Sequence, residues 1–191
     1  SSSAIISTGA EPGLTAAAEE YNFSAQVVTA AAWSSGGNLS TGRQRAGGFG
    51  NAQNSAVVVA GATAPPASAL SASVYYYGSA WSSGGSVNTA RFNMTAFGTE
   101  TAGVLSGKGS PSVSYAGTTE EYNGSSWTTV SPYSSPYVNY RSSCGPETAG
   151  LLAGGVKAPG QGEFDNVVEE YDGSTWTSGT ALPQYQSYNC Q

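Results

Sequence analysis

The chain has 191 residues, of which 39% are hydrophobic, 11% aromatic and only 9% charged, and its formal net charge is −6. Disorder usually requires low hydrophobicity together with high net charge, so this composition predicts a folded chain. Six Lys and Arg residues in all do not supply the clustered cations that bind a phosphate backbone, and no apolar run approaches the roughly 18 residues of a membrane span. We therefore expect neither nucleic-acid binding nor membrane insertion.

Four tryptophans divide the sequence into nearly equal lengths, with gaps of 48, 46 and 49 residues. A period of this size is typical of propellers and other repeat arrays. We expect a single domain of four repeat units, in which a short C-terminal segment completes the first unit. The tryptophans are Trp33, Trp81, Trp127 and Trp176, the units span approximately 1–42, 43–90, 91–138 and 139–185, and the last segment is 186–191.

Each unit is expected to contain four short strands, because short apolar runs bounded by glycine and turn residues indicate buried strands. No segment has a sustained helical period with caps. In chain order, the expected apolar strands are 4–6, 56–59, 102–105 and 149–152, and the strands that precede them end at Phe49, Phe97, Cys144 and Cys190.

The last two strands of each unit are expected to form a hairpin with a tryptophan at the start of its second strand. The clearest copies are 120–128 and 169–177, in which Glu-Glu-Tyr is followed by Asn-Gly or Asp-Gly and then by Trp-Thr. Asn-Gly and Asp-Gly favour a tight primed turn, because such a turn needs positive φ.

The two ends of the chain together match one unit. The segment 144–152 aligns without a gap to Cys190-Gln191 followed by 1–7, so Ile5 and Ile6 are expected to lie beside the strand that carries Cys190. This strand would close the ring within one chain or complete the sheet of a neighbouring copy. The opening Ser1-Ser2-Ser3, with no basic and apolar region after it, is expected of a mature or trimmed chain.

The repeat resembles the kelch family through an apolar strand that runs into Gly154-Gly155, a later Tyr171 and a later Trp176. The sequence of 169–177 is most similar to kelch-like repeats in phage appendage proteins from aquatic environments. Together with the four repeat units and the match between the two ends, the resemblance predicts an all-β, four-bladed kelch-like propeller with four strands per blade, one blade being shared by the two termini. It also implies a structural or adhesive role on a particle or fibre.

One tryptophan and one tyrosine recur in each unit and are expected to pack between blades as a repeat core, although they could instead stack on sugars. The Pro-rich segment 131–137 interrupts the repeat and is either an insertion or a contact loop that carries Tyr133 and Tyr137. The repeat core comprises Trp33, Trp81, Trp127, Trp176, Tyr21, Tyr76, Tyr122 and Tyr171, and the aromatic residues outside it that are better ligand candidates are Tyr75, Tyr77, Tyr133, Tyr137 and Tyr185.

Paired acids and single arginines also follow the repeat. Neighbours in a strand point to opposite faces, so an adjacent acid pair does not flank one glycosidic bond as a hydrolase pair would. We expect structural Arg–Glu ion pairs between adjacent blades instead. The acids are Glu19 and Glu20, Glu120 and Glu121, and Glu169 and Glu170, and the arginines are Arg43, Arg91 and Arg141.

No histidine is present, which removes the usual general base and the commonest metal ligand. We predict no catalytic, cofactor or metal site. Cys144 and Cys190 occupy equivalent places, either as two small buried apolar residues or as a disulfide. Candidate glycosylation sequons begin at Asn22, Asn38, Asn93 and Asn123.

These features favour a non-enzymatic structural or adhesive subunit of a phage appendage or extracellular fibre, on a virion surface or outside the cell and built from copies of itself. The alternative is a monomeric glycan-binding propeller module that recognises surface glycan through its loops. A secreted carbohydrate-active enzyme is the third hypothesis.

Overall fold

The computed structural model describes residues 33–65, 68–107, 117–133, 138–157 and 163–184, together with the strand segments 4–7 and 18–21. At 4–7, 18–21, 33–34 and 138 it describes the backbone. The strand expected at 186–191, with Cys190, therefore lies outside the described residues.

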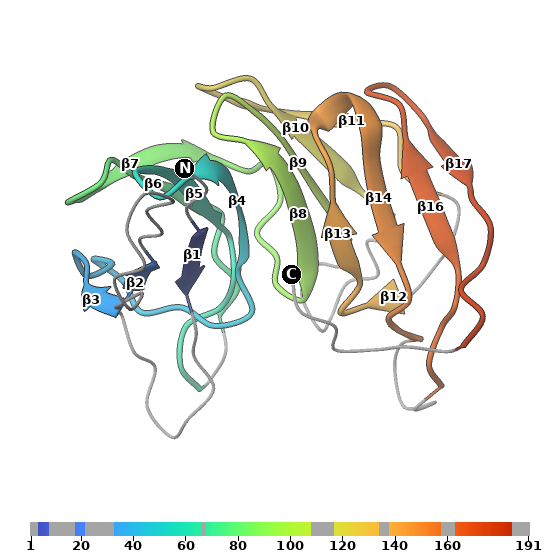
Figure 1. Ribbon diagram of the computed structural model, residues 1–191, viewed down its shortest axis with the longest axis horizontal. Helices are drawn as coiled ribbons and strands as arrows, with labels where there is room; N and C mark the ends of the chain where they lie inside the picture. The colour runs from blue at the N-terminus through green and yellow to red at the C-terminus, as the bar shows by residue number, and fades with distance from the viewer. Residues whose placement is uncertain are drawn as a thin grey trace, which may run out of the picture.

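The described chain is all-β and consists mainly of four antiparallel sheets in chain order (Figure 1). The first sheet has three described strands, and each of the others has four. The first sheet contains β1 (Ala4–Ser7), β2 (Ala18–Tyr21) and β3 (Trp33–Ser35); the second contains β4 (Gly47–Ala52), β5 (Ser55–Val59), β6 (Ala72–Tyr76) and β7 (Trp81–Ser86); the third contains β8 (Met94–Thr99), β9 (Ala102–Gly107), β10 (Thr119–Tyr122) and β11 (Trp127–Val130); and the fourth contains β13 (Ser142–Cys144), β14 (Gly150–Ala153), β16 (Val168–Tyr171) and β17 (Trp176–Ser178).

Two small elements accompany the fourth sheet. A three-residue 3-10 turn, η1 (Glu147–Ala149), joins β13 to β14, and β12 (Val138–Asn139) pairs with β15 (Val156–Lys157). In the part of the chain that the structure describes, no helix combines the length and the apolar character that a membrane crossing requires.

In each of the four main sheets, every strand pairs with the next strand of that sheet in chain order. Each repeat tryptophan is the first residue of its strand, as expected, and lies opposite the repeat tyrosine across the hairpin, as Tyr122 does opposite Trp127. The strand order expected for each four-stranded unit is therefore confirmed in the second, third and fourth sheets.

The hairpin turns differ from the expected tight primed turn. Because Tyr122 pairs with Trp127, four residues form the loop between them, with Gly124 at a φ of +91°. The Asn123 side chain accepts hydrogen bonds from the backbone N–H groups of Ser125 and Ser126 at 3.0 and 2.9 Å. This Asx turn supplies the reversal that two residues with positive φ would supply in a shorter hairpin.

Asp172 builds the same loop in the fourth sheet. Hydrogen bonds from the Thr175 backbone and from Ser174 lower the pKa of Asp172 to about 2. Asn and Asp therefore serve equally at this position, because both offer a side-chain oxygen as acceptor.

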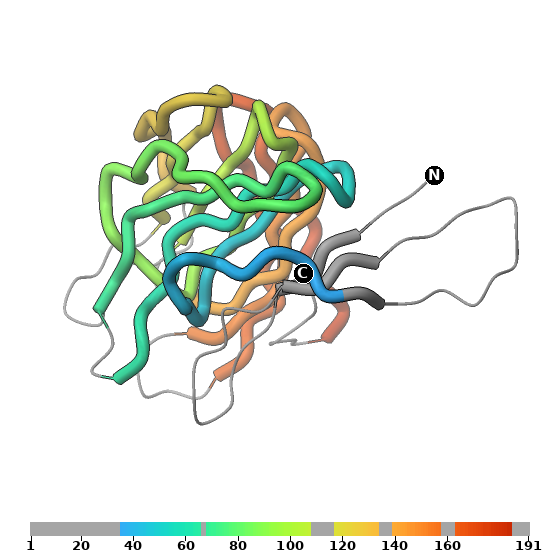
Figure 2. Tube along the Cα trace, turned by 90° about the vertical axis from the view of Figure 1, so that its left-hand side faces the viewer, coloured from blue at the N-terminus to red at the C-terminus, as the bar shows by residue number. Residues whose placement is uncertain are grey.

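The four sheets follow one another along an arc, and the first and fourth sheets lie at its two ends (Figure 1). Seen from the side, the strands of the second sheet lie in front of those of the third and fourth (Figure 2). Their first strands are neighbours, with β4 against β8 and β8 against β13. Stacked four-stranded antiparallel sheets are shared by sandwich and propeller-like folds.

Small residues bring these first strands close together. A Cβ at Gly47 in β4 would lie 2.9 Å from the Cβ of Ala96 in β8. Between β8 and β13, Ser143 accepts a hydrogen bond from Thr95 at 2.6 Å and donates one to the Ala96 carbonyl at 2.9 Å. The sheets are thus joined at their first strands by close backbone approach and by hydroxyl groups.

Candidate functional site

The second, third and fourth sheets each carry a row of three residues on one face, and in the second and third sheets this row faces the sheet that follows in the chain. The strand register places these residues abreast on the first, second and third strands of their sheet. We call them the forward rows. They are Phe49, Val57 and Tyr75 in the second sheet, Phe97, Val104 and Glu121 in the third, and Cys144, Leu151 and Glu170 in the fourth.

The opposite face of each sheet carries a receiving row, which comes from the last three strands of that sheet and contains the repeat tyrosine and tryptophan. The same register is found in all four sheets. From the first sheet to the fourth, the receiving rows are Ala4, Tyr21 and Trp33; Ala56, Tyr76 and Trp81; Gly103, Tyr122 and Trp127; and Gly150, Tyr171 and Trp176.

A phenylalanine seated on a glycine forms the contact between the second and third sheets. The Phe49 ring meets Trp127 edge to face, with centroids 6.1 Å apart and an interplanar angle of 74°. A Cβ on Gly103 would lie 2.4 Å from the Phe49 ring, so the ring occupies the space that a side chain would need. The hydroxyl groups of Tyr75 and Tyr122 are in hydrogen-bond contact beside it.

The third and fourth sheets repeat this contact. Phe97 meets Trp176 at 6.2 Å and 88°, and a Cβ on Gly150 would lie 2.1 Å from the Phe97 ring. Tyr171 donates a hydrogen bond to Glu121 Oε1. Burial, followed by this bond to the carboxylate, raises the pKa of Tyr171 well above its usual value.

The structure thus places Trp127, Trp176, Tyr122 and Tyr171 between sheets, where the sequence predicted packing. Tyr76 is also buried and packs on Trp81 with ring centroids 4.9 Å apart. Trp81 donates its indole N–H to the Gly37 carbonyl at 2.7 Å, beyond the end of β3. The side chains of Tyr21 and Trp33 lie outside the described ones.

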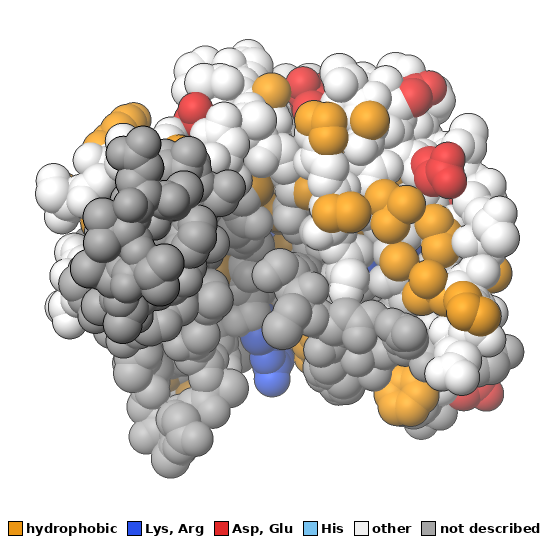
Figure 3. Space-filling view, in the orientation of Figure 1, with side chains coloured by type: hydrophobic (Ala, Val, Ile, Leu, Met, Phe, Trp, Pro, Cys, Tyr) orange, Lys and Arg blue, Asp and Glu red, His pale blue; other side chains and the backbone are white. Residues whose placement is uncertain are grey.

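The forward row of the fourth sheet is open. Phe49, Phe97 and Val104 are between 0% and 8% exposed, because the next sheet covers them. In the fourth sheet Cys144 and Glu170 are exposed and Leu151 is half-buried. Figure 3 shows apolar side chains gathered over this sheet, so a face of the kind that is covered elsewhere meets solvent here.

Sequence reasoning predicted Arg–Glu pairs between adjacent units, and the structure corrects this. The carboxylate of Glu120 in β10 pairs with Arg91, which immediately precedes β8 of the same sheet, and both side chains are 0% exposed. Arg91 also donates to the Gly107 and Thr118 carbonyls at 3.3 and 2.9 Å. Strand alternation places Glu120 on the face that carries Tyr122, and Arg91 of the same unit reaches its carboxylate there.

The other two repeat arginines have different partners. Arg43 donates to the Ala60 and Ala72 carbonyls at 3.1 and 2.9 Å, and burial lowers its pKa. Arg141 lies 3.6 Å from Asp165 and 5.0 Å from the centroid of the Tyr133 ring. The repeated arginine therefore binds whatever acceptor its own unit supplies.

Tyr133 does not belong to an exposed contact loop. It is 5% exposed and meets Trp176 edge to face at 5.7 Å, so its ring contributes to the core that covers the third and fourth sheets. Tyr137, its predicted partner in the loop, and Tyr185 lie outside the described residues.

The predicted disulfide and glycosylation sites are placed only in part. Cys144 is exposed and free, and Cys190 is outside the described chain. Asn38 and Asn123 are exposed, Asn93 is half-buried, and Asn22 is outside the described chain. Among the described residues, no three His, Cys, Asp or Glu side chains gather as metal ligands would.

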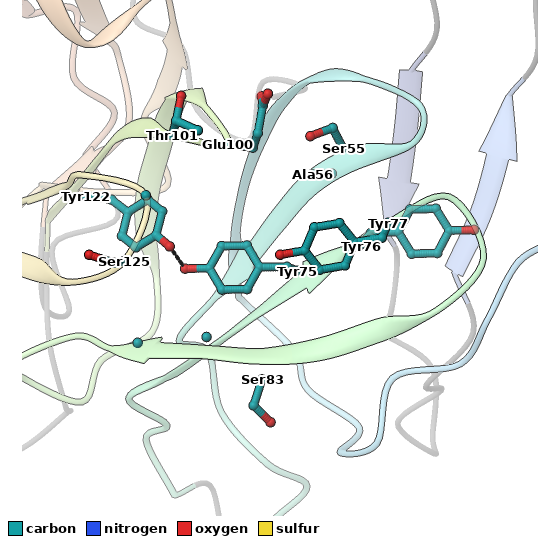
Figure 4. A pocket seen from close by; sticks show the side chains of 13 residues that line it. Ser55, Ala56, Tyr75, Tyr76, Tyr77, Ser83, Glu100, Thr101, Tyr122 and Ser125 are labelled. Atoms are coloured by element: carbon teal, nitrogen blue, oxygen red, sulfur yellow. Dashed lines mark hydrogen bonds between the residues drawn. The ribbon is translucent and has the colours of Figure 1, made fainter.

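A pocket of about 400 Å³ opens between the second and third sheets at their hairpin ends (Figure 4). Tyr75 and Tyr122 point toward one another across it, and the Tyr77 residue at its edge is 68% exposed. Glu100 also lines it, and the Oε2 atom of Glu100 is buried without a hydrogen-bond partner among the described residues. The pocket thus combines aromatic faces with an unsatisfied carboxylate oxygen.

Sequence reasoning missed the forward rows as a set. It did recognise that Cys144 occupies the place of Phe49 and Phe97. The additional signal was the glycine at 103 and 150, where the first and second units carry Ala4 and Ala56 at the same register.

No family model matches the sequence, and no curated protein matches it. Among solved structures, the chain is similar to the structure of YjhT, with 11% identity and a TM-score of 0.69. The match covers 90% of this chain and 61% of the YjhT chain. At this identity the similarity shows a shared fold alone, which this chain forms over somewhat less than two thirds of the length of YjhT.

Proposed function

We propose that this protein is a non-enzymatic structural or adhesive subunit, assembled from copies of itself into a phage appendage or extracellular fibre, outside the cell or on a virion surface. In this proposal the four sheets are blades of a kelch-like propeller, and residues 186–191 complete the first blade in their own chain or in a neighbouring copy. The resemblance of 169–177 to appendage repeats supports the appendage role.

The observation that carries the proposal is the open forward row of the fourth sheet. Equivalent rows in the second and third sheets are covered by a following sheet. An exposed apolar face bordered by polar groups is typical of a protein–protein contact. Because no further four-stranded sheet follows the fourth sheet in the described residues, association with another copy provides the cover for Leu151 and Cys144.

Replacing Glu170 by arginine is expected to weaken this association. The side chain is exposed, so the fold should tolerate the change, whereas a reversed charge on the forward row opposes contact with another sheet. Glu163→Arg is the matched control, since Glu163 is 63% exposed and lies outside the row in a surface ion pair with Lys157. Sedimentation velocity should give a lower average mass for Glu170→Arg than for wild type and the control; equal masses for all three would contradict the proposal.

The pocket beside Tyr77 favours a second candidate function, glycan binding by a single module. Its volume lies in the range of small-molecule sites, and an exposed aromatic face suits a sugar ring. On a glycan array, Tyr77→Ala should abolish binding, while Phe164→Ala, which removes another exposed ring, should leave it unchanged. Binding that survives Tyr77→Ala, or no binding by the wild type, would exclude this pocket as a glycan site.

A further inference from the structure

The open forward row has a specific counterpart in the same sequence. We propose that Cys144, Leu151 and Glu170 of one copy bind the receiving row of the first sheet, Ala4 and Tyr21 with Trp33, of a second copy. This inference rests on the proposed function and names the surface that the assembly uses. The two contacts within the chain provide its template.

The sizes of the residues in the two rows are complementary. Where the receiving row contains Gly103 or Gly150, the preceding forward row contains a phenylalanine, whose ring fills the space of the missing Cβ. The receiving row of the first sheet contains Ala4 at this register. The open forward row contains Cys144 in place of phenylalanine, so the smaller forward residue corresponds to the larger residue of the receiving row.

A tyrosine–glutamate hydrogen bond between neighbouring sheets supports the same pairing. Tyr171 of the fourth receiving row donates to Glu121 of the third forward row. Glu170 has the register of Glu121, and Tyr21 has the register of Tyr171. The register therefore sets position 21 of the second copy, a tyrosine, opposite Glu170, which is exposed in the single chain.

The first sheet that covers the open row comes from another copy of the chain. Within one chain the first and fourth sheets lie at opposite ends of the arc (Figure 1). The chain superposes over 90% of its own length on 61% of the YjhT chain, so the fold of this neighbour extends beyond the part that one copy of this chain matches. Contact between two different surfaces is heterologous, and such contacts build rings or filaments.

Disulfide trapping tests this pairing directly. Ala4→Cys is introduced together with Cys190→Ser, so that position 4 and Cys144 are the only thiols, and the full chain is treated with copper phenanthroline. A disulfide requires Cα atoms within about 7 Å, so the proposed contact should give dimers and higher species on a non-reducing gel. Ser7→Cys in the same background is the control, since successive strand residues alternate faces and position 7 lies on the face opposite to position 4.

The possible results separate this inference from the proposed function. A monomer with an internal disulfide would show closure within one chain and would overturn the inference. Assembly without a disulfide would overturn this pairing and leave self-assembly intact, whereas a chain that stays monomeric would contradict both. If Ala4→Cys does not fold, a second variant probes the same register. It combines Tyr21→Cys with Glu170→Cys in a background without the native cysteines, and it should give the same dimers and higher species on the gel.

Discussion

Replacing Glu120 by alanine is expected to lower the free energy of unfolding by about 3–5 kcal/mol, because removing one partner of a buried ion pair leaves the other charge buried and uncompensated. Arg91 and Glu120 are both 0% exposed. Glu120 Oε2 also accepts a hydrogen bond from the Asn88 backbone at 2.7 Å, which the change removes as well. Urea unfolding followed by tryptophan fluorescence measures the effect.

The chain itself provides a comparison for this prediction. In the second sheet, Val74 has the register of Glu120, and Arg43 is held by two backbone carbonyls. Glu120→Val therefore tests whether carbonyls alone can hold Arg91, and Glu163→Ala, at an exposed position, should change stability by less than about 0.5 kcal/mol. A cost below about 1 kcal/mol for Glu120→Val would contradict the importance of the ion pair.

Gly150→Ala is expected to cost about 1–3 kcal/mol, the usual effect of overpacking a filled core. The new Cβ would lie 2.1 Å from the Phe97 ring, so the ring must leave its edge-to-face contact with Trp176. Phe97→Cys should relieve the overlap, because the double variant then places a cysteine opposite an alanine. These are the residue types of Cys144 and Ala4 in the proposed contact. In a thermal or urea double-mutant cycle, the double variant should lose at least 1 kcal/mol less than the sum of the two single variants.

The control for this cycle is Gly48→Ala. A Cβ at Gly48 would make an ordinary contact at 3.6 Å with the Val57 carbonyl, so the substitution should be close to neutral. If the losses in the free energy of unfolding for Gly150→Ala and Phe97→Cys simply add, the two positions do not share space. The inference that Cys144 matches Ala4 by size would then also be wrong.

The strand layout could be predicted because it depends on local features. Trp81, Trp127 and Trp176 begin strands as expected, since turn residues and apolar runs mark short strands along the chain. The placement of Glu120 and Glu121 on opposite faces of their sheet also follows from strand alternation. The partner of Arg91 was predicted in the wrong sheet, because the sequence does not reveal which carboxylate lies across the same sheet.

Contacts between sheets were harder to predict. The Pro-rich context of Tyr133 suggested an exposed loop, yet the ring packs on Trp176, because a tyrosine gains more by covering an apolar edge than by remaining in solvent. The number of sheets in a closed ring depends on small rotations between neighbouring repeats. Sequence spacing carries no information on these rotations, so the periodicity alone could not distinguish a closed ring from an open arc.

Sedimentation velocity of the unaltered chain over a wide concentration range tests the central claim, that the open face of the fourth sheet is covered by another copy. The account predicts an average mass that rises above that of one chain as the concentration increases, with a single-chain species on dilution. One species with the mass of a single chain at every concentration would contradict it.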